Sequence, residues 1–312
     1  MIEQSPAVEQ TYVQAGPGES AILARFGVEA SALLGSGGEA RIFALDDERV
    51  LRVQAPSDTP PDRELAELLD SWAGQDLGFG LPRVLSQARL GSQNYGIERR
   101  LPGVPLARWL ADTTDAARRR TGLLSLLDAA GRLRELPLLR TGFGRVLGDP
   151  RRYGSLPELL AAQMAVGVGH SAGLLAQVVP GLDDRVSRLL ARLDDRVVTP
   201  AFCHADLAPA NVMVDADGRV TAVLDFSVHA LAADPVLDQV GAVAFLEMTP
   251  YPGNLADAAW LQRELIGRLG GDAWLVDAYR RFYALYYAMD HQLIPWCAEQ
   301  LLASEVEPEG GR

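Results

Sequence analysis

The stretch FCHADLAPANVMVDADGRVTAVLDFS, residues 202–227, decides how the rest of the chain is interpreted. It holds two short apolar runs, Val212–Val214 and Val220–Leu224, separated by the turn-forming sequence Asp215–Gly218. Short β-branched runs on either side of an Asp/Gly turn are typical of a β-hairpin. The sequence therefore predicts a hairpin with polar segments at both ends.

Four polar residues mark those ends. His204, Asp206 and Asn211 precede the first strand with the spacing H-x-D-x-x-x-x-N, and Asp225 directly follows the second strand. Because Asp and Asn favour turns, an isolated run of this kind is often only a loop. Here the hairpin would fix the separation between Asn211 and Asp225, which favours a functional site over a simple turn.

This arrangement resembles the aminoglycoside phosphotransferase and choline kinase superfamily, relatives of the protein kinases. The family pattern is H-G-D-x-x-x-x-N, followed by an apolar strand and D-[FW]. The resemblance implies that Asp206 is the catalytic base or orients the acceptor hydroxyl, and that His204 braces the loop. It also implies that Asn211 and Asp225 are magnesium ligands, and oxygen ligands of this kind suit that hard cation. Catalysis of phosphoryl transfer depends mainly on the correct placement of such groups.

The loop departs from the family pattern at three alanines. Ala205 stands where glycine is usual, and Ala208 and Ala210 stand where histidine and glycine are frequent. None of these changes removes a functional group from the chemistry. Ala205 and Ala210 do leave the loop without the freedom of glycine to adopt positive φ.

A glycine-rich segment, LGSGGEA at residues 34–40, joins two predicted strands near the N-terminus. Glycines let backbone amides approach a phosphate closely. On its own, such a segment could equally be an ordinary hairpin turn. Because it precedes the motif in kinase order, the resemblance implies nucleotide contacts from Ser36, Gly37 and Gly38.

A cation and a carboxylate follow this segment. Arg52 lies on the predicted strand Val50–Val53, where a kinase normally carries the lysine that binds the α- and β-phosphates. The chain contains no lysine, so the arginine reflects residue usage more than a lost activity. Glu64 lies early in the next predicted helix and by the family pattern would pair with Arg52, with Glu67 as the fallback. The alternative for Glu64 is a solvated helix carboxylate.

The sequence YGIERRLPG, residues 95–103, resembles the hinge of the same family. The resemblance implies that the adenine edge forms hydrogen bonds with the backbone around Arg99 and Leu101. Any sequence supplies backbone groups, so the side chains themselves add nothing to this assignment.

The order of elements predicts an α+β, protein-kinase-like bilobal fold. Short strands and one helix over residues 62–72 predict a small antiparallel N-lobe that binds nucleotide, residues 1–101, in which residues 1–18 form a loose arm. Long leucine-rich helical segments, residues 156–179 among them, predict a mostly helical C-lobe, residues 102–312, with the catalytic loop and the acceptor site.

Composition narrows the choice of partners. The chain has 29 basic and 41 acidic residues, a net charge of −12. A nucleic-acid partner requires a basic face and is not expected, whereas a small, hydroxylated and cationic substrate fits the charge. No apolar run approaches the roughly 20 residues of a membrane helix. No membrane partner and no secretory signal are expected, which makes the cytoplasm the expected compartment.

The resemblance implies a kinase that uses Mg²⁺ and transfers the γ-phosphoryl group of ATP or GTP to a hydroxyl of a small molecule. An antibiotic is one such acceptor, in a resistance or self-protection role. The aromatic residues Tyr283, Tyr286 and Tyr287 could also contact the acceptor, but packing of an amphipathic helix is the favoured interpretation for these tyrosines. The candidates for acceptor contacts are charged residues of the C-terminal helices: Glu247, Asp257, Asp290 and His291.

Three alternatives remain open at this point. A metabolic amino-alcohol or sugar kinase would use the same chemistry. A nucleotide-binding pseudokinase would explain Arg52 and the missing glycines, but Asp206, Asn211 and Asp225 are all present. A protein kinase is disfavoured, because there is no A-P-E-type segment and no room for a long activation loop after Asp225.

Overall fold

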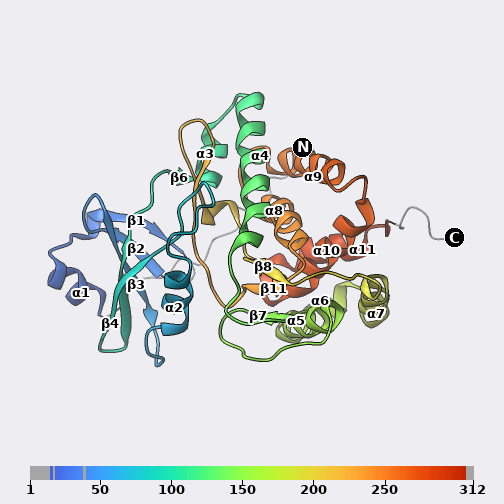
Figure 1. Ribbon diagram of the computed structural model, residues 1–312, viewed down its shortest axis with the longest axis horizontal. Coiled ribbons are helices and arrows are strands. Elements are labelled where there is room, and N and C mark those ends of the chain that lie inside the picture. The colour runs from blue at the N-terminus through green and yellow to red at the C-terminus, as the bar shows by residue number, and fades with distance from the viewer. Residues whose placement is uncertain (1–14, 17, 38–39, 307–312) are drawn as a thin grey trace. The chain divides into compact units, whose positions relative to one another are not determined.

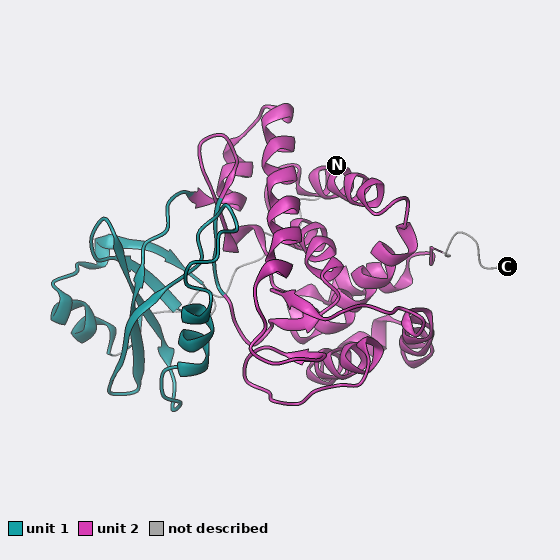
Figure 2. Ribbon diagram, in the orientation of Figure 1, with its two compact units in different colours: residues 1–103, 221–225 teal, residues 104–220, 226–312 magenta. Residues whose placement is uncertain are grey.

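The computed structural model describes residues 15–16, 18–37 and 40–306, and these form two compact units (Figure 2). The first unit comprises the chain up to Gly103 together with Thr221–Asp225, and the second comprises the remainder. The expected loose arm falls largely on residues 1–14 and 17, outside the described residues, as does Gly38 of the predicted phosphate loop.

The first unit is built on a five-stranded antiparallel sheet with the strand order β1-β2-β3-β5-β4 (Figure 1). Along β3, Leu51 and Val53 are buried while the intervening Arg52 is half-buried, which is the alternation expected of a strand with one apolar face. The strands are β1 (Leu33–Ser36), β2 (Ala40–Ala44), β3 (Arg49–Pro56), β4 (Val84–Leu90) and β5 (Gln93–Arg99).

Two helices accompany this sheet. Helix α1 (Glu19–Phe26) inserts Ile22 into the apolar cluster formed by β2, β3 and β5. Helix α2 (Arg63–Ser71) contacts β4 and begins at Asp62, whose side chain accepts a hydrogen bond from the Leu65 N–H. This N-cap satisfies one of the backbone donors that a helix leaves unpaired at its start.

The second unit is mostly helical. Its centre is α8, which is buried along most of its length and contacts α4, α9 and α10. The helices are α3 (Leu106–Asp112), α4 (Ala116–Arg132), α5 (Leu156–His170), α6 (Leu174–Val178), α7 (Leu182–Leu193), α8 (Val236–Met248), α9 (Asn254–Arg268), α10 (Ala273–Tyr286) and α11 (Ile294–Leu302).

One predicted helix is divided in the structure. The segment predicted as helical over residues 156–179 forms α5 and the short α6, with a break at Ala172 and Gly173. Both of these residues have positive φ, 50° and 81°, which no right-handed helix accommodates. Apolar residues continue across the break because α5 packs against α10 and α6 packs against α11, so both segments bury apolar side chains.

Short strands place the chemical motif. Strand β8 (Ala201–Cys203) leads into the loop with His204 and pairs with β11 (Leu231–Ala233). Further along, β9 (Val212–Val214) and β10 (Val220–Val223) follow the predicted hairpin pattern. The turn between them is closed by a hydrogen bond from the Asp215 N–H to the Arg219 carbonyl, 2.9 Å. Two-residue strands complete the small sheets: β6 (Val104–Pro105), which pairs with β9, and β7 (Gly144–Arg145), which pairs with β11.

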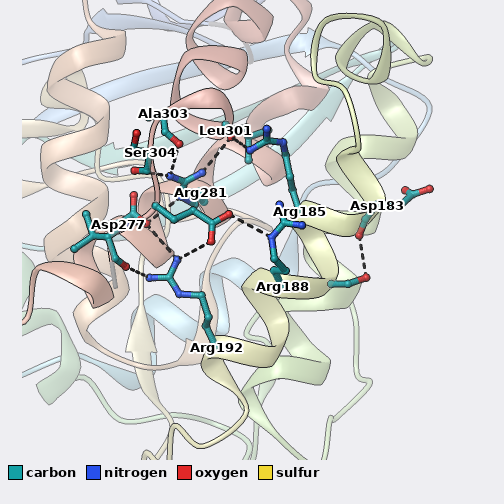
Figure 3. Close-up of polar contacts among 12 residues, drawn as sticks. Asp183, Arg185, Arg188, Arg192, Asp277, Arg281, Leu301, Ala303 and Ser304 are labelled. Carbon is teal, nitrogen blue, oxygen red and sulfur yellow. Dashed lines mark hydrogen bonds and ion pairs between the residues drawn. The ribbon is translucent and has the colours of Figure 1, made fainter. Parts of the chain in front are cut away.

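Arginines hold the C-terminal segment against the helices (Figure 3). Arg281 of α10 is buried, donates to the Asp277 carboxylate at 3.0 Å, and also reaches the end of α11. There it donates to the carbonyl oxygens of Leu301, Ala303 and Ser304. A cation at this position satisfies carbonyls that the helix leaves unpaired and complements its dipole.

None of the helices in the described ranges has both the length and the apolar character that crossing a bilayer requires.

Candidate active site

The loop that carries Asp206 is anchored by a buried carboxylate from α8. Asp238 accepts hydrogen bonds from the backbone N–H groups of His204 (2.7 Å) and Ala205 (2.8 Å). Burial raises the pKa of Asp238 to about 7, and the two N–H donors act in the opposite direction. The loop therefore has a fixed backbone path where the chain leaves β8.

The side chain of His204 completes this support. Its Nδ1 accepts a hydrogen bond from the Asp206 N–H at 3.3 Å, and its ring lies 4.7 Å from that of Phe226, centroid to centroid. His204 is buried, which agrees with the predicted bracing role. The neighbouring Cys203 is buried as well, and burial holds the pKa of its thiol well above the ordinary value, so it is not an activated nucleophile.

Asp206 and Asn211 lie at the two ends of one tight turn. The Asp206 carbonyl accepts from the Ala208 N–H at 2.9 Å and from Asn211 Nδ2 at 3.1 Å, and the Asn211 N–H donates to the Ala208 carbonyl at 2.8 Å. The amide nitrogen of Asn211 is thus engaged with the loop, which leaves its Oδ1 as the donor atom for a cation. The structure brings these two predicted site residues together as neighbours on one loop.

Ala205 adopts a backbone conformation that favours glycine. Its φ is 58°, in the left-handed region, where an alanine is disfavoured by about 1–2 kcal/mol. The family pattern has glycine at this position, and the structure gives the physical reason. The buried Asp238, which accepts hydrogen bonds from the N–H groups of His204 and of Ala205 itself, holds the alanine in this conformation.

We expect the substitution Ala205→Gly to raise the free energy of unfolding by up to about 1 kcal/mol. Relief of the left-handed strain exceeds the entropy that glycine adds to the unfolded chain, about 0.5–1 kcal/mol. Ala208→Gly is the matched control, because Ala208 has a φ of −66° and glycine there brings only the entropic loss. Urea unfolding of both variants measures the difference. Equal effects at the two positions would contradict the strain at Ala205.

Asp225 lies at the end of β10 and is fixed within the first unit. Its φ is 63°, and its carboxylate forms an ion pair with Arg52 at 3.1 Å. The residues before it are bonded to the hinge segment: Thr221 Oγ1 donates to the Pro102 carbonyl at 2.6 Å, and the Gly80 N–H donates to the Thr221 carbonyl at 2.8 Å. The predicted metal ligand and the predicted phosphate-binding cation are therefore in direct contact.

Glu98 is a member of this cluster that the sequence analysis did not assign. In the β3–β5 ladder Arg52 lies opposite Gly96, so Glu98, two residues further on, shares its face of the sheet. Burial raises the pKa of Glu98, Arg52 lowers it, and Asp225 raises it again. The sequence YGIE, residues 95–98, contains the pattern from which Glu98 could have been found. Alternate residues of a strand share one face, so Glu98 lies on the same face as Gly96 and is a diagonal neighbour of Arg52.

The other predicted nucleotide contacts are placed as follows. Glu64 lies in the first turn of α2, and its pairing with Arg52 stays a prediction. In the glycine-rich loop, the Gly37 N–H donates to the Ala40 carbonyl at 2.9 Å. A Cβ added at Gly37 would meet no atom within 4 Å among the described residues beyond its chain neighbours, so packing against these residues does not require glycine there. Ser36, the preceding residue, ends β1.

In the hinge, the Arg99 N–H donates to the Arg83 carbonyl at 2.9 Å. This bond occupies the backbone donor of Arg99, so of the two predicted residues Leu101 is the one expected to donate to an adenine.

The four predicted acceptor contacts lie in different settings. Glu247 accepts two hydrogen bonds from Arg280, at 2.6 and 2.8 Å, and one from Trp296 at 2.9 Å. Asp257 forms an ion pair with Arg119.

The remaining two are neighbours at the start of a short 3₁₀ helix and are exposed. Asp290 accepts a hydrogen bond from the Gln292 N–H at 2.9 Å, and His291 Nε2 lies 3.0 Å from the His170 carbonyl oxygen, to which it donates. The structure brings Asp290 and His291 together and binds Glu247 and Asp257 to separate arginines.

Comparison with solved structures identifies several similar folds. A thermostable mutant of the aminoglycoside phosphotransferase APH(4)-Ia, in complex with AMP-PNP and hygromycin B, is 21% identical, with coverage of 92% of this chain and 97% of that chain and a TM-score of 0.69. The enzyme APH(3″)-Id from Streptomyces rimosus, with ADP and streptomycin, is 19% identical, with coverage of 92% and 99% and a TM-score of 0.53.

A GDP complex of a mutant aminoglycoside 2′-phosphotransferase-IIIa is 18% identical, with coverage of 90% and 94% and a TM-score of 0.54. At these identities the likeness concerns the fold, and the predicted α+β, protein-kinase-like class is confirmed. No protein with a curated function matches the sequence. The model of the phosphotransferase enzyme family, named APH, matches residues 32–274. The chain belongs to this phosphotransferase family.

Proposed function

We propose that this protein transfers the γ-phosphoryl group of ATP or GTP to a hydroxyl of a small molecule. The observation that carries the proposal is the anchored loop around Asp206. The buried Asp238 accepts hydrogen bonds from the two preceding backbone N–H groups, and the Asp206 carbonyl accepts one from the Asn211 side chain. A carboxylate held in one place can orient a hydroxyl and accept its proton without reorganisation. Membership of a phosphotransferase family supports this chemistry.

Asn211 and Asp225 are the residues that would hold Mg²⁺. Their donor atoms, an amide oxygen and a carboxylate oxygen, fit a cation that prefers oxygen ligands and usually completes its shell with phosphates and water. When bound, Mg²⁺ neutralises charge on the nucleotide phosphates. In the structure, Arg52 already balances the Asp225 carboxylate, so Arg52 would exchange this partner for phosphate when the nucleotide binds.

The remaining nucleotide contacts fall on the first unit. Ser36, Gly37 and Gly38 of the glycine-rich loop would contact the phosphates, and Glu64 would orient Arg52. The hinge would contact the base through the backbone around Arg99 and Leu101, with the Leu101 N–H as the donor because the Arg99 N–H is already bonded to Arg83. Solved relatives carry AMP-PNP, ADP or GDP, which supports a purine nucleotide without a choice between ATP and GTP.

For the acceptor we propose a hydroxylated, cationic small molecule, such as an antibiotic, consumed in the cytoplasm where the nucleotide is abundant. The net charge of −12 supports a cationic ligand. Hygromycin B and streptomycin, bound by two of the similar proteins, are hydroxylated compounds of this kind. Asp290 and His291 are exposed and would contact the acceptor directly, whereas Glu247 and Asp257 would act through the arginines that they bind.

A nucleotide-consumption screen tests this function. Purified protein is incubated with Mg²⁺, ATP or GTP, and a panel of aminoglycosides, amino alcohols and sugars, and products are identified by mass spectrometry. We expect at least one aminoglycoside to gain one phosphoryl group. Phosphorylation of amino alcohols or sugars alone would identify a metabolic kinase instead. No transfer to any acceptor, together with intact nucleotide binding, would contradict the proposal in favour of a pseudokinase.

A variant series at Arg52 tests its contact with the phosphates. Arg52→Ala should raise the KM for nucleotide by about 10- to 100-fold, because a charge-assisted hydrogen bond contributes roughly 1.5–3 kcal/mol. Glu64→Ala should also raise it, and the two effects should be non-additive if one interaction is shared. Arg52→Lys should keep partial to full activity, since a point charge on the same strand restores the usual kinase geometry.

Arg49→Ala is the control for this series. Arg49 lies on the same strand but pairs with Asp46 in the exposed turn, so its removal should leave the KM unchanged. Steady-state kinetics over nucleotide concentration gives the KM of the wild type, of the four single variants and of the double variant Arg52→Ala/Glu64→Ala, which the test of additivity requires. Full activity in Arg52→Ala would show that Arg52 does not bind the phosphates. Additive effects of Arg52→Ala and Glu64→Ala on the KM would show that the two residues do not share one interaction.

A further inference from the structure

A tyrosine from the end of α10 contacts the proposed catalytic carboxylate. The Tyr287 hydroxyl lies 3.0 Å from Asp206 Oδ1 and 2.9 Å from the Ala205 carbonyl oxygen. Both oxygens are acceptors, so the single hydroxyl proton is shared between them. A hydrogen bond to an ionised carboxylate is about twice as strong as one between neutral groups, which favours Asp206 as its main acceptor.

The ring of Tyr287 is fixed by aromatic neighbours on several sides. It stacks against His229, with centroids 5.8 Å apart, and meets Phe245 and Tyr286 edge-on, each at 5.2 Å. Side chains packed in this way have few alternative rotamers. Burial and the Asp206 charge hold the pKa of Tyr287 well above the ordinary value, so the hydroxyl remains a donor.

Two glycines let the neighbouring helices approach this part of the unit. A Cβ on Gly167 of α5 would lie 2.2 Å from the carbonyl oxygens of Leu285 and Tyr286, and a Cβ on Gly241 of α8 would lie 2.6 Å from the Tyr283 hydroxyl. Because Gly167 lies close to the backbone of α10 and Gly241 lies close to the Tyr283 side chain, α10 has little room to shift. The position of the Tyr287 hydroxyl is therefore set by the packing of three helices.

Tyr283, one helical turn earlier, shows what a purely structural tyrosine looks like. It is also buried, but its hydroxyl donates to the Leu237 carbonyl at 3.1 Å. The two residues differ in what their hydroxyls bind: Tyr283 bonds the Leu237 carbonyl, whereas Tyr287 bonds the Asp206 carboxylate in addition to the Ala205 carbonyl. The contact with a carboxylate that the proposed function needs is therefore what distinguishes Tyr287 from Tyr283.

We propose that Tyr287 is a positioning residue for phosphoryl transfer, whose hydroxyl fixes the Asp206 carboxylate through Oδ1 so that Oδ2 meets the acceptor hydroxyl. This inference rests on the proposed function, because Asp206 is taken as the residue that orients or deprotonates the acceptor. Tyr287 itself touches neither substrate nor nucleotide in this account. Tyr287 contributes by orienting the Asp206 carboxylate. A correctly oriented carboxylate acts on the acceptor hydroxyl at a higher effective concentration.

Kinetics of Tyr287→Phe test this role, with Tyr283→Phe as the matched control. Both substitutions remove one buried hydroxyl from the same part of the protein. We expect Tyr287→Phe to lower kcat by about 10- to 100-fold with the KM for nucleotide unchanged, and Tyr283→Phe to keep kcat within about twofold. In an Asp206→Asn background, Tyr287→Phe should have no further effect on kcat, because the two residues act through one step.

A crystal structure of Tyr287→Phe gives a readout that does not depend on turnover. We expect the fold to be retained and the Asp206 side chain to occupy more than one rotamer, while the wild type and Tyr283→Phe show one. If Asp206 keeps its single position, or if the two phenylalanine variants lose kcat equally, Tyr287 is a packing residue and the inference is overturned. If the wild type phosphorylates no acceptor, the proposed function fails and the rotamers of Asp206 still decide the positioning claim.

Discussion

Replacing Asp206 with asparagine should lower kcat by about 10²–10⁴-fold while leaving the fold and nucleotide binding intact. Asparagine has nearly the same shape and still offers an oxygen to the Tyr287 hydroxyl, so the packing of the loop is kept. It cannot accept a proton at neutral pH and carries no charge with which to orient the acceptor hydroxyl. The loss should therefore fall on the chemical step rather than on substrate binding.

Asp217→Asn is the matched control for this variant. Asp217 lies in the same motif, at the exposed turn before β10, and the same change of charge should leave kcat as in the wild type. Thermal unfolding of both variants shows whether the fold is kept, and calorimetry shows whether nucleotide still binds. A kcat near the wild-type value in Asp206→Asn, measured on the true acceptor, would show that Asp206 is not the base.

Removing the carboxylate of Asp225 should abolish nucleotide binding that depends on Mg²⁺. With Asp225→Ala, one of the two proposed protein ligands is lost, together with the ion pair between Asp225 and Arg52. Because a cation held by few protein ligands depends on each of them, we expect affinity for magnesium–nucleotide to fall below detection in calorimetry.

The backbone of Asp225 requires a second variant. Its φ of 63° suits Asp or Gly but strains alanine, so Asp225→Ala could lose affinity through local distortion. Asp225→Gly adopts this φ without strain and also lacks the carboxylate, so it should show the same loss. Unchanged affinity for magnesium–nucleotide in the glycine variant would exclude Asp225 as a ligand.

Local patterns in the sequence predicted the parts of the fold that local interactions determine. The alternating strands of the first unit, α2 after its Asp62 cap, and the β9–β10 hairpin pattern follow from runs of a few residues and their turns. Strands of two residues, such as β6 and β7, have no period to detect. The break between α5 and α6 depends on backbone angles at Ala172 and Gly173 that apolar spacing does not encode.

The residues of the candidate site also divide into those that local sequence predicts and those that distant contacts determine. The spacing of Asp206 and Asn211 is local, and their shared turn could be anticipated from it. The contacts that fix the turn come from far along the chain: Asp238 is 34 residues from His204, and Tyr287 is 81 residues from Asp206. A single sequence does not record which distant side chain packs where, because many polar residues could supply the same hydrogen bond. For this reason the contact of Tyr287 with Asp206 emerges only in three dimensions.

The most direct test of the account is the fate of the γ-phosphoryl group. Wild-type protein, Asp206→Asn and Asp217→Asn are incubated with Mg²⁺, γ-labelled ATP or GTP, and the acceptors hygromycin B, streptomycin and kanamycin, and the label on each acceptor is measured. The account predicts label on an acceptor hydroxyl with the wild type and Asp217→Asn, and about 10²–10⁴-fold slower transfer with Asp206→Asn. Equal transfer by all three proteins, or label released only to water, would contradict it.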